Sequence, residues 1–135
     1  MTAWLGVVSA AHVRRARSLG FAQVNEGTRA GLARMSAGDR LFYYSPVEER
    51  GDAERLQEFT AVGIVADDTI WREDEGAFRP FRRRVDYLVT HPVALDDVRD
   101  QLELTSAANW GYQLRRGLIP LSDADAELIE SKMVA

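Results

Sequence analysis

The feature that most constrains this chain is a succession of extended patterns between residues 40 and 89, separated by turns and polar loops instead of helices. Residues 40–45 predict a strand that stops at Pro46, and residues 58–66 predict a strongly apolar strand. A turn at 67–68 precedes a short strand over 69–72, and residues 81–89 alternate charged and apolar side chains. Strands in direct succession favour antiparallel pairing over a doubly wound parallel sheet, so the order predicts a mixed α+β fold.

Helical signals lie mainly at the two ends of the chain. Residues 3–9 predict a buried strand, and Ser9 is placed to cap a helix over Ala10–Leu19 that ends at Gly20. Residues 93–102 have a helical pattern, and residues 118–121 predict a last short strand. Ser122 opens a C-terminal helix with acidic residues in its first turn. We expect a curled β-barrel of about five or six strands with the first and last helices packed against it.

Length and composition indicate one domain spanning residues 1–135, with 46% apolar residues to form its core. The sequence has no cysteine, which excludes a disulfide framework and a cysteine zinc site. It also has neither a signal-like N-terminus nor an apolar run near the roughly 20 residues of a membrane span. We therefore expect a cytoplasmic protein that has no membrane partner.

Charge is distributed unevenly along the chain. The formal net charge is −4, which argues against an unselective grip on phosphates, yet residues 1–47 hold six arginines and two acidic residues. Lys132 is the single lysine, so nearly all basic residues are arginines. Arginine suits planar recognition of phosphates and base edges, although a GC-rich genome would also favour it. One basic face on an acidic protein fits the pattern.

Signatures of catalysis and cofactor binding are missing from the sequence. It contains no phosphate-binding P-loop, no dinucleotide glycine fingerprint and no Gly-x-Ser-x-Gly elbow. His12 and His91 are far apart and lack metal-ligand spacing. We therefore expect no cofactor, no metal and no catalytic residues.

Aromatic and amide side chains cluster at two points. Tyr43 should face one side of its strand, while Phe42 and Tyr44 face the other. The segment 109–113 (NWGYQ) places Trp110 beside Gly111 with an amide side chain at each end. Flat apolar surfaces stack nucleobases, and fixed amides read base edges. Core packing is the alternative for these aromatics, and we favour it for Phe42.

Several short strings together resemble the EVE domain of bacterial proteins, in matching order over almost the whole chain. They include WLGVVS at 4–9, GFAQV at 20–24, YYSP at 43–46, FTAVG at 59–63 and NWGYQ at 109–113. The resemblance implies a PUA-like fold related to YTH and ASCH domains, in which helices pack around a curled barrel. It also implies recognition of a modified base in RNA or DNA.

The matching motif positions give the residues expected at a ligand site. The segments 21–23, 43–45 and 109–113 should converge on one concavity, with Trp110 as a stacking wall. Its mouth should include members of the set Arg82, Arg83, Arg115 and Arg116. The residues expected to bind the ligand are Ser9, Phe21, Gln23, Tyr43, Tyr44, Ser45, Arg82, Asn109, Trp110, Gly111 and Arg115.

The function expected from these observations is a non-catalytic module that binds a modified nucleobase of a nucleic acid in an aromatic pocket. One alternative is a sensor of free nucleosides or other small molecules, which would need no basic track beside the pocket. Another is a small hydrolase on the same fold, in which Glu58, Asp86 or His12 would face the cleft as a general base.

Overall fold

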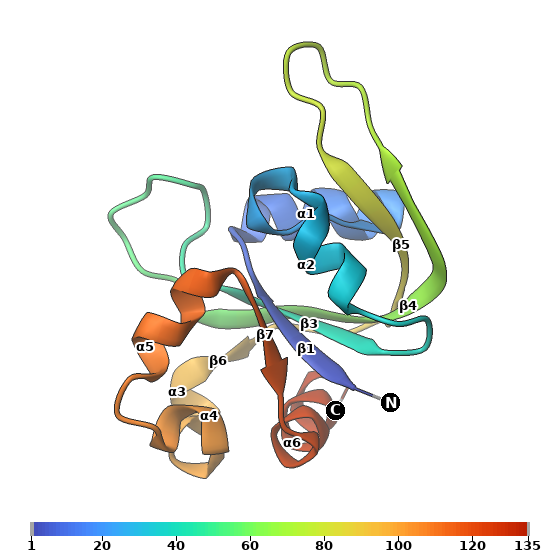
Figure 1. Ribbon diagram of the computed structural model, residues 1–135. Helices are drawn as coiled ribbons and strands as arrows, with labels where there is room; N and C mark the ends of the chain where they lie inside the picture. Colours follow the sequence, from blue (N-terminus) through green and yellow to red (C-terminus); the bar gives the residue numbers. More distant parts are fainter. Residues whose placement is uncertain (1, 135) are drawn as a thin grey trace.

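The computed structural model describes residues 2–134, which form one mixed sheet with helices on both of its faces (Figure 1). The strands are β1 (Ala3–Val7), β2 (Phe21–Ala22), β3 (Arg40–Ser45), β4 (Glu58–Arg72), β5 (Phe81–Tyr87), β6 (Val93–Ala94) and β7 (Leu118–Leu121). The α-helices are α1 (Ala10–Leu19), α2 (Arg29–Arg34), α3 (Leu95–Val98), α4 (Glu103–Ser106), α5 (Trp110–Gln113) and α6 (Asp123–Met133). Three short 3-10 segments complete the fold: η1 (Asn25–Gly27), η2 (Arg99–Gln101) and η3 (Leu114–Arg116). The predicted α+β class is confirmed.

The sheet is curled and open. Its strand order is β2-β5-β4-β3-β1-β7, and β6 pairs with the start of β4 outside this path. β1 and β3 are parallel, whereas every other pairing in the described part of the chain is antiparallel. The edge strands β2 and β7 do not pair with each other, so the expected barrel is a seven-stranded open sheet.

Both faces of the sheet are covered, which explains why three consecutive aromatics on β3 are all buried. Phe42 and Tyr44 pack in the core on the side of α3 and α6, whereas Tyr43 packs on the opposite side with α1 and α2. Figure 1 shows these two helical layers above and below the sheet. Burying an aromatic side chain contributes about 1.5–3 kcal/mol, so this run anchors the sheet from both sides.

The first helix forms as its local signals predict. Ser9 has an extended backbone and its hydroxyl accepts a hydrogen bond from the His12 N–H at 3.4 Å. Gly20 ends the helix with a left-handed φ of 74°, and its N–H donates to Ala16 O. The apolar positions Val13 and Ala16 face the sheet and are fully buried. The N-terminal cap, the buried apolar positions and the terminal glycine all agree, so α1 spans its predicted residues.

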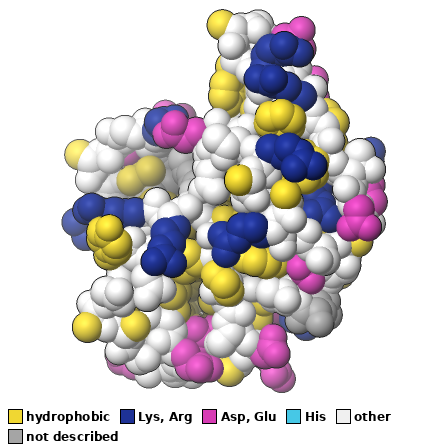
Figure 2. Space-filling model, viewed as in Figure 1, with side chains coloured by type: hydrophobic (Ala, Val, Ile, Leu, Met, Phe, Trp, Pro, Cys, Tyr) yellow, Lys and Arg dark blue, Asp and Glu magenta, His cyan; other side chains and the backbone are white. Residues whose placement is uncertain are grey.

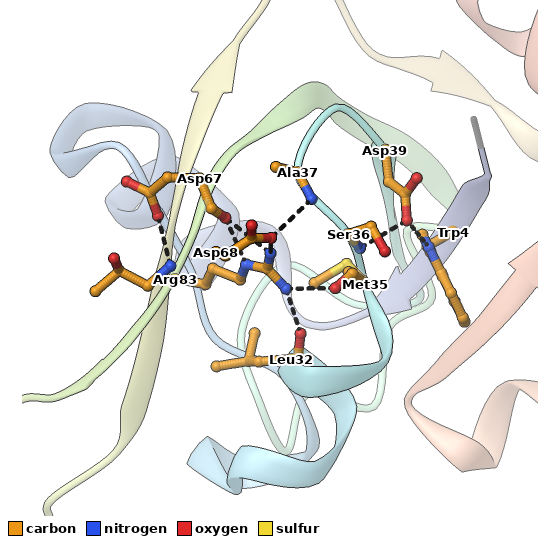
Figure 3. Close-up of polar contacts among 10 residues, drawn as sticks. Trp4, Leu32, Met35, Ser36, Ala37, Asp39, Asp67, Asp68 and Arg83 are labelled. Carbon is orange, nitrogen blue, oxygen red and sulfur yellow. Dashed lines mark hydrogen bonds and ion pairs between the residues drawn. The ribbon is translucent and has the colours of Figure 1, made fainter.

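β4 runs through residues 67–68, where the sequence predicts a turn. Its pairing with β5 shifts register between Val65 and Ile70, which is a bulge within a continuous strand. Arg83 of β5 reaches this bulge and donates to Asp67 O, and it pairs with the Asp68 carboxylate at 3.1 Å (Figure 3). The same guanidinium donates to Leu32 O and Met35 O at the end of α2.

Two segments project from the body of the curled sheet. The β4–β5 hairpin projects from one side of the molecule, and the loop that follows β3 projects from the other (Figure 1). Residues 93–102, predicted as one helix, instead form β6, α3 and η2 in succession. Within residues 2–134 no helix is long and apolar enough to cross a bilayer.

Candidate functional site

The main cleft of the protein lies where the parallel strands β1 and β3 end. It encloses about 660 Å³, a size typical of small-ligand sites. Its walls come from the β1–α1 connection, the start of η1, the loop after β3, the tip of the β4–β5 hairpin and η3. Segments far apart in the sequence therefore supply its side chains. Of the expected site residues, Ser9, Gln23 and Arg115 line this cleft.

Gln23 is held from behind by two buried side chains. Its backbone N–H donates to the Tyr43 hydroxyl at 3.3 Å, and its Oε1 accepts from Arg82 Nε at 3.0 Å. Burial raises the pKa of Tyr43 to about 12, so the hydroxyl keeps its proton. Because the carbonyl oxygen of the amide is occupied, the NH₂ group is the part of Gln23 that remains for a ligand.

Arg82 and Phe21 form the floor beneath Gln23. The Arg82 guanidinium carbon lies 3.9 Å from the centroid of the Phe21 ring, and both side chains are buried. The Tyr87 hydroxyl donates to Phe21 O at 2.7 Å, which fixes the backbone of β2. Phe21, Tyr43 and Arg82 therefore position the cleft residue Gln23 and do not line the cleft themselves.

Asn25 is a cleft residue that the sequence analysis did not identify. Its backbone has a positive φ of 50°, and the next residue, Glu26, also has a positive φ of 58°. The Asn25 amide fits between two glycines: a Cβ at Gly31 would lie 2.8 Å from Nδ2, and a Cβ at Gly117 would overlap Oδ1. Asn tolerates left-handed backbone better than most residues, which fits this position. The side chain is thereby fixed at the edge of the cleft.

His12 adds an imidazole one turn into α1. Burial lowers the pKa of His12 below its ordinary value of 6.5, and the positive charges of Arg15 and Arg82 lower this pKa further. A hydrogen bond with the Gln23 backbone raises the pKa but does not offset these effects. The ring is therefore neutral at pH 7. Its Nε2 is buried without a hydrogen-bond partner in the described structure, which is unusual for a polar atom.

The cleft rim carries three arginines in different electrostatic states. Arg15 pairs with Glu75, and Arg50 pairs with Glu26 at 2.8 Å. Arg115 has no carboxylate partner among residues 2–134, and its guanidinium lies against the ring of Tyr112. Figure 2 shows Lys and Arg side chains in a band across the face that carries α5 and the base of the hairpin. The basic face expected from the arginine distribution is consistent with this band.

The remaining expected site residues lie away from the cleft. Tyr44 packs against Phe59 in the core with ring centroids 5.4 Å apart, and the Ser45 hydroxyl hydrogen-bonds Thr60 at 2.8 Å. Asn109, Trp110 and Gly111 form the start of α5, outside the cleft lining.

Tyr43 and Trp110 do not meet, contrary to the expected convergence of their segments. Tyr43 is buried on the α1 side of the sheet, and Trp110 packs half-buried against the opposite core. The Arg99 guanidinium lies 5.5 Å from the Trp110 ring. The reason is the sheet itself, which separates the two faces. Of the four arginines expected near the mouth, Arg115 lines the cleft, whereas Arg83 is a buried structural residue.

The chemistry available in the cleft is that of polar recognition. The Ser9 hydroxyl already caps α1, and of the three candidate bases Glu58, Asp86 and His12, the histidine alone lines the cleft. Within the described residues no group of three His, Cys, Asp or Glu side chains is arranged to hold a metal. A second hollow of about 380 Å³ beside α6 is lined by three acidic residues and by Arg40, which pairs with Glu130.

Together the open curled sheet, the helices on both faces and the polar cleft beyond β1 and β3 define an α+β domain of the PUA-like class. The chain belongs to the EVE domain family, which matches residues 2–132. It is 47% identical to a UPF0310 protein of Renibacterium salmoninarum, over 98% of this chain and 95% of that protein. It is 36% identical to the UPF0310 protein YdcG of Bacillus subtilis, over 96% and 90% of the two chains.

Solved structures share this fold at low sequence identity. A mutant of the ZmASCH protein from Zymomonas mobilis superimposes with a TM-score of 0.59 at 12% identity, covering 98% of this chain and 99% of that one. A hypothetical protein from Leishmania major gives a TM-score of 0.61 at 11% identity, covering 97% and 93%. These likenesses establish the fold.

Proposed function

We propose that this EVE domain is a non-catalytic binding module that holds a modified nucleobase of a nucleic acid in the main cleft. The observation that carries the proposal is a 660 Å³ cleft whose polar side chains are fixed from behind and whose rim carries arginines. A nucleobase needs a slot of this kind, with apolar walls and a few placed hydrogen-bonding groups. The family membership supports the same reading.

The polar groups in the cleft suit the edge of a base. Gln23 offers its NH₂ group because Arg82 holds its carbonyl oxygen, and the His12 side chain lines the cleft beside it. Asn25 adds a second amide, which lies close against Gly31 and Gly117. Groups that are already fixed lose little freedom when they bind, so they discriminate well between correct and incorrect edges.

The apolar part of the lining suits a small added group on the base. Val7, Val8, Pro46, Val47 and Leu114 contribute to the walls. Burying one extra methyl contributes about 0.8 kcal/mol, which corresponds to about fourfold tighter binding. The exposed aromatic in the lining is Phe78, on the hairpin, so a base would stack there and not on Trp110.

The rim arginines suit the phosphates on either side of an extruded base. Arg115 is free to meet a phosphate, and exposed pairs such as Arg50–Glu26 contribute little stability, so they exchange readily. The pairing of Arg15 and Arg50 with carboxylates is also the observation that favours a free-nucleoside sensor. Salt dependence separates the two, because each phosphate contact steepens the fall of affinity with salt.

The test measures binding of nine-nucleotide single strands that carry N6-methyladenine or 5-methylcytosine at the centre, in DNA and RNA, against unmodified strands. Gln23→Glu keeps an oxygen for Arg82 but removes the NH₂ group, so it should weaken binding of the preferred strand about tenfold or more. Gln101→Glu is the matched control, because that side chain is exposed on η2 and lies outside the cleft lining.

Three results would decide against the proposal. They are equal affinity for all modified and unmodified strands, equal loss in Gln23→Glu and Gln101→Glu, and affinity for free nucleosides that matches that for strands. The last would favour the sensor. A melting curve of each variant shows that the fold is retained.

A further inference from the structure

The surface beside the cleft carries an exposed aromatic that the cleft does not use. Tyr112 is 65% exposed, although it lies on a segment that is otherwise tied to the core. α5 and η3 continue into each other, and Trp110 and Leu114 sit one helical turn apart. Both pack against the core, which leaves Tyr112 between them facing outward. A large exposed aromatic on an anchored turn indicates a contact surface.

The same turn connects this ring directly to the cleft. Arg115 lines the cleft, and its guanidinium carbon lies 5.7 Å from the centroid of the Tyr112 ring. Arg116 follows it and is exposed, and neither arginine has a carboxylate partner among residues 2–134. The ring is therefore one side chain away from the cleft mouth, in the part of the rim with uncompensated positive charge.

The turn that carries Tyr112, formed by α5 and η3, is rigid as well as exposed. The Gln113 amide donates to Asn109 Oδ1 at 3.0 Å across the turn, and Arg99 lies over Trp110 at 5.5 Å. Gly117 ends η3, and its N–H donates to Leu114 O. A fixed ring flanked by arginines is the arrangement that stacks the base of a single strand while the arginines meet its phosphates.

We propose that Tyr112 stacks the nucleotide next to the one held in the cleft, and that Arg115 and Arg116 contact the backbone between and beyond them. The partner is thereby a single-stranded polynucleotide, because in a duplex the neighbouring base keeps its own stacking partners and leaves the ring uncovered. This inference rests on the proposed function, since it assigns the class of polymer to the same cleft. A stacking role also accounts for the position of Tyr112, which lies outside the cleft but at the rim of the cleft.

The experiment compares Tyr112→Ala, Tyr112→Phe and the control Leu19→Ala, which removes another exposed side chain at the end of α1. The probes are the preferred modified nine-mer, unmodified nine-nucleotide oligothymidine at low salt, the free modified nucleoside, and the nine-mer annealed to its complement. Stacking of one base corresponds to about five- to hundredfold in affinity. Tyr112→Ala should lose that factor for both single strands and nothing for the nucleoside, while Tyr112→Phe and Leu19→Ala bind as wild type.

The outcomes separate this inference from the proposed function. If the modified strand is preferred but Tyr112→Ala binds it as wild type, the stacking role is wrong and the cleft function stands. If no modification is preferred but Tyr112→Ala weakens oligothymidine binding, the stacking role stands and the base selectivity is wrong. Equal loss of nucleoside binding in Tyr112→Ala, a duplex bound as tightly as the single strand, or no strand binding by the wild type would each overturn the inference.

Discussion

Gly117 offers a direct test of whether the cleft residue Asn25 is locked by close packing. Gly117 has a left-handed φ of 79°, and a Cβ there would overlap Asn25 Oδ1 and lie 3.1 Å from Asn25 Cγ. Left-handed backbone costs a residue with a Cβ about 1–2 kcal/mol, and overpacking adds about 1–3 kcal/mol. Gly117→Ala should therefore lower the free energy of unfolding by about 2–5 kcal/mol.

Gly20 supplies a control without the clash. Its φ of 74° is also positive, although its ψ is 35° whereas that of Gly117 is −32°, and the atom nearest to an added Cβ is Val85 O at an ordinary 3.8 Å. Gly20→Ala should then cost the backbone part alone, about 1–2 kcal/mol. The difference between the two variants then combines the clash with Asn25 and the difference in ψ.

A double-mutant cycle completes the test by urea unfolding followed through tryptophan fluorescence. In an Asn25→Gly background, the nearest remaining atom of that residue is Cα at 3.8 Å, so Gly117→Ala should cost about 1–3 kcal/mol less there than in the wild-type background. The reasoning is refuted if Gly117→Ala is no costlier than Gly20→Ala in the wild-type background. It is equally refuted if Gly117→Ala costs as much when the Asn25 side chain is absent as when it is present.

Two further predictions concern pH. Burial alone would raise the pKa of Asp39, but hydrogen bonds from Ser36, Trp4 and Thr2 lower it below 3.8 overall. Asp39→Asn should thus lower the free energy of unfolding at neutral pH by about 1–3 kcal/mol. Urea titrations should show the difference between wild type and variant closing as pH falls through the lowered pKa. The lowered pKa of His12 means that the unfolded chain takes up its proton first, so stability should fall as pH drops below about 6.5. His12→Gln should flatten that slope, and an unchanged slope would contradict a buried neutral ring.

Local sequence signals were sufficient where an element is defined by its own residues. The capping serine, the buried stripe and the terminal glycine place α1 at Ala10–Leu19, and the proline after residue 45 stops β3 where it was predicted to stop. They failed at residues 67–68, because an aspartate pair ordinarily marks a turn. There the strand continues since Arg83 from the next strand occupies the Asp67 carbonyl and the Asp68 carboxylate. That contact spans 16 residues and leaves no local trace.

The candidate site is harder to predict from the sequence, for a related reason. Alternation along β3 separates Tyr43 from its neighbours, but it cannot show that helices cover both faces and bury all three aromatics. An aromatic-rich string therefore predicts a pocket wall equally well. Asn25 is missed for the opposite reason, because nothing in its local sequence marks it. What distinguishes it is a left-handed backbone and a fit between two glycines that lie 6 and 92 positions further along the chain. Only Ser9, Gln23 and Arg115 of the expected residues line the cleft.

The topology explains why these scattered residues meet. β1 and β3 run in parallel and end together, so the α1 start and the loop after β3 emerge side by side. The N–H groups of Ala10 and Ala11 donate to Val47 O and Glu48 O at 3.0 and 2.9 Å, which ties that loop to the helix. The tie places Arg50 opposite Glu26 across the cleft. Because this exposed pair contributes little stability, a phosphate can replace the carboxylate at small cost while the amides behind it stay fixed.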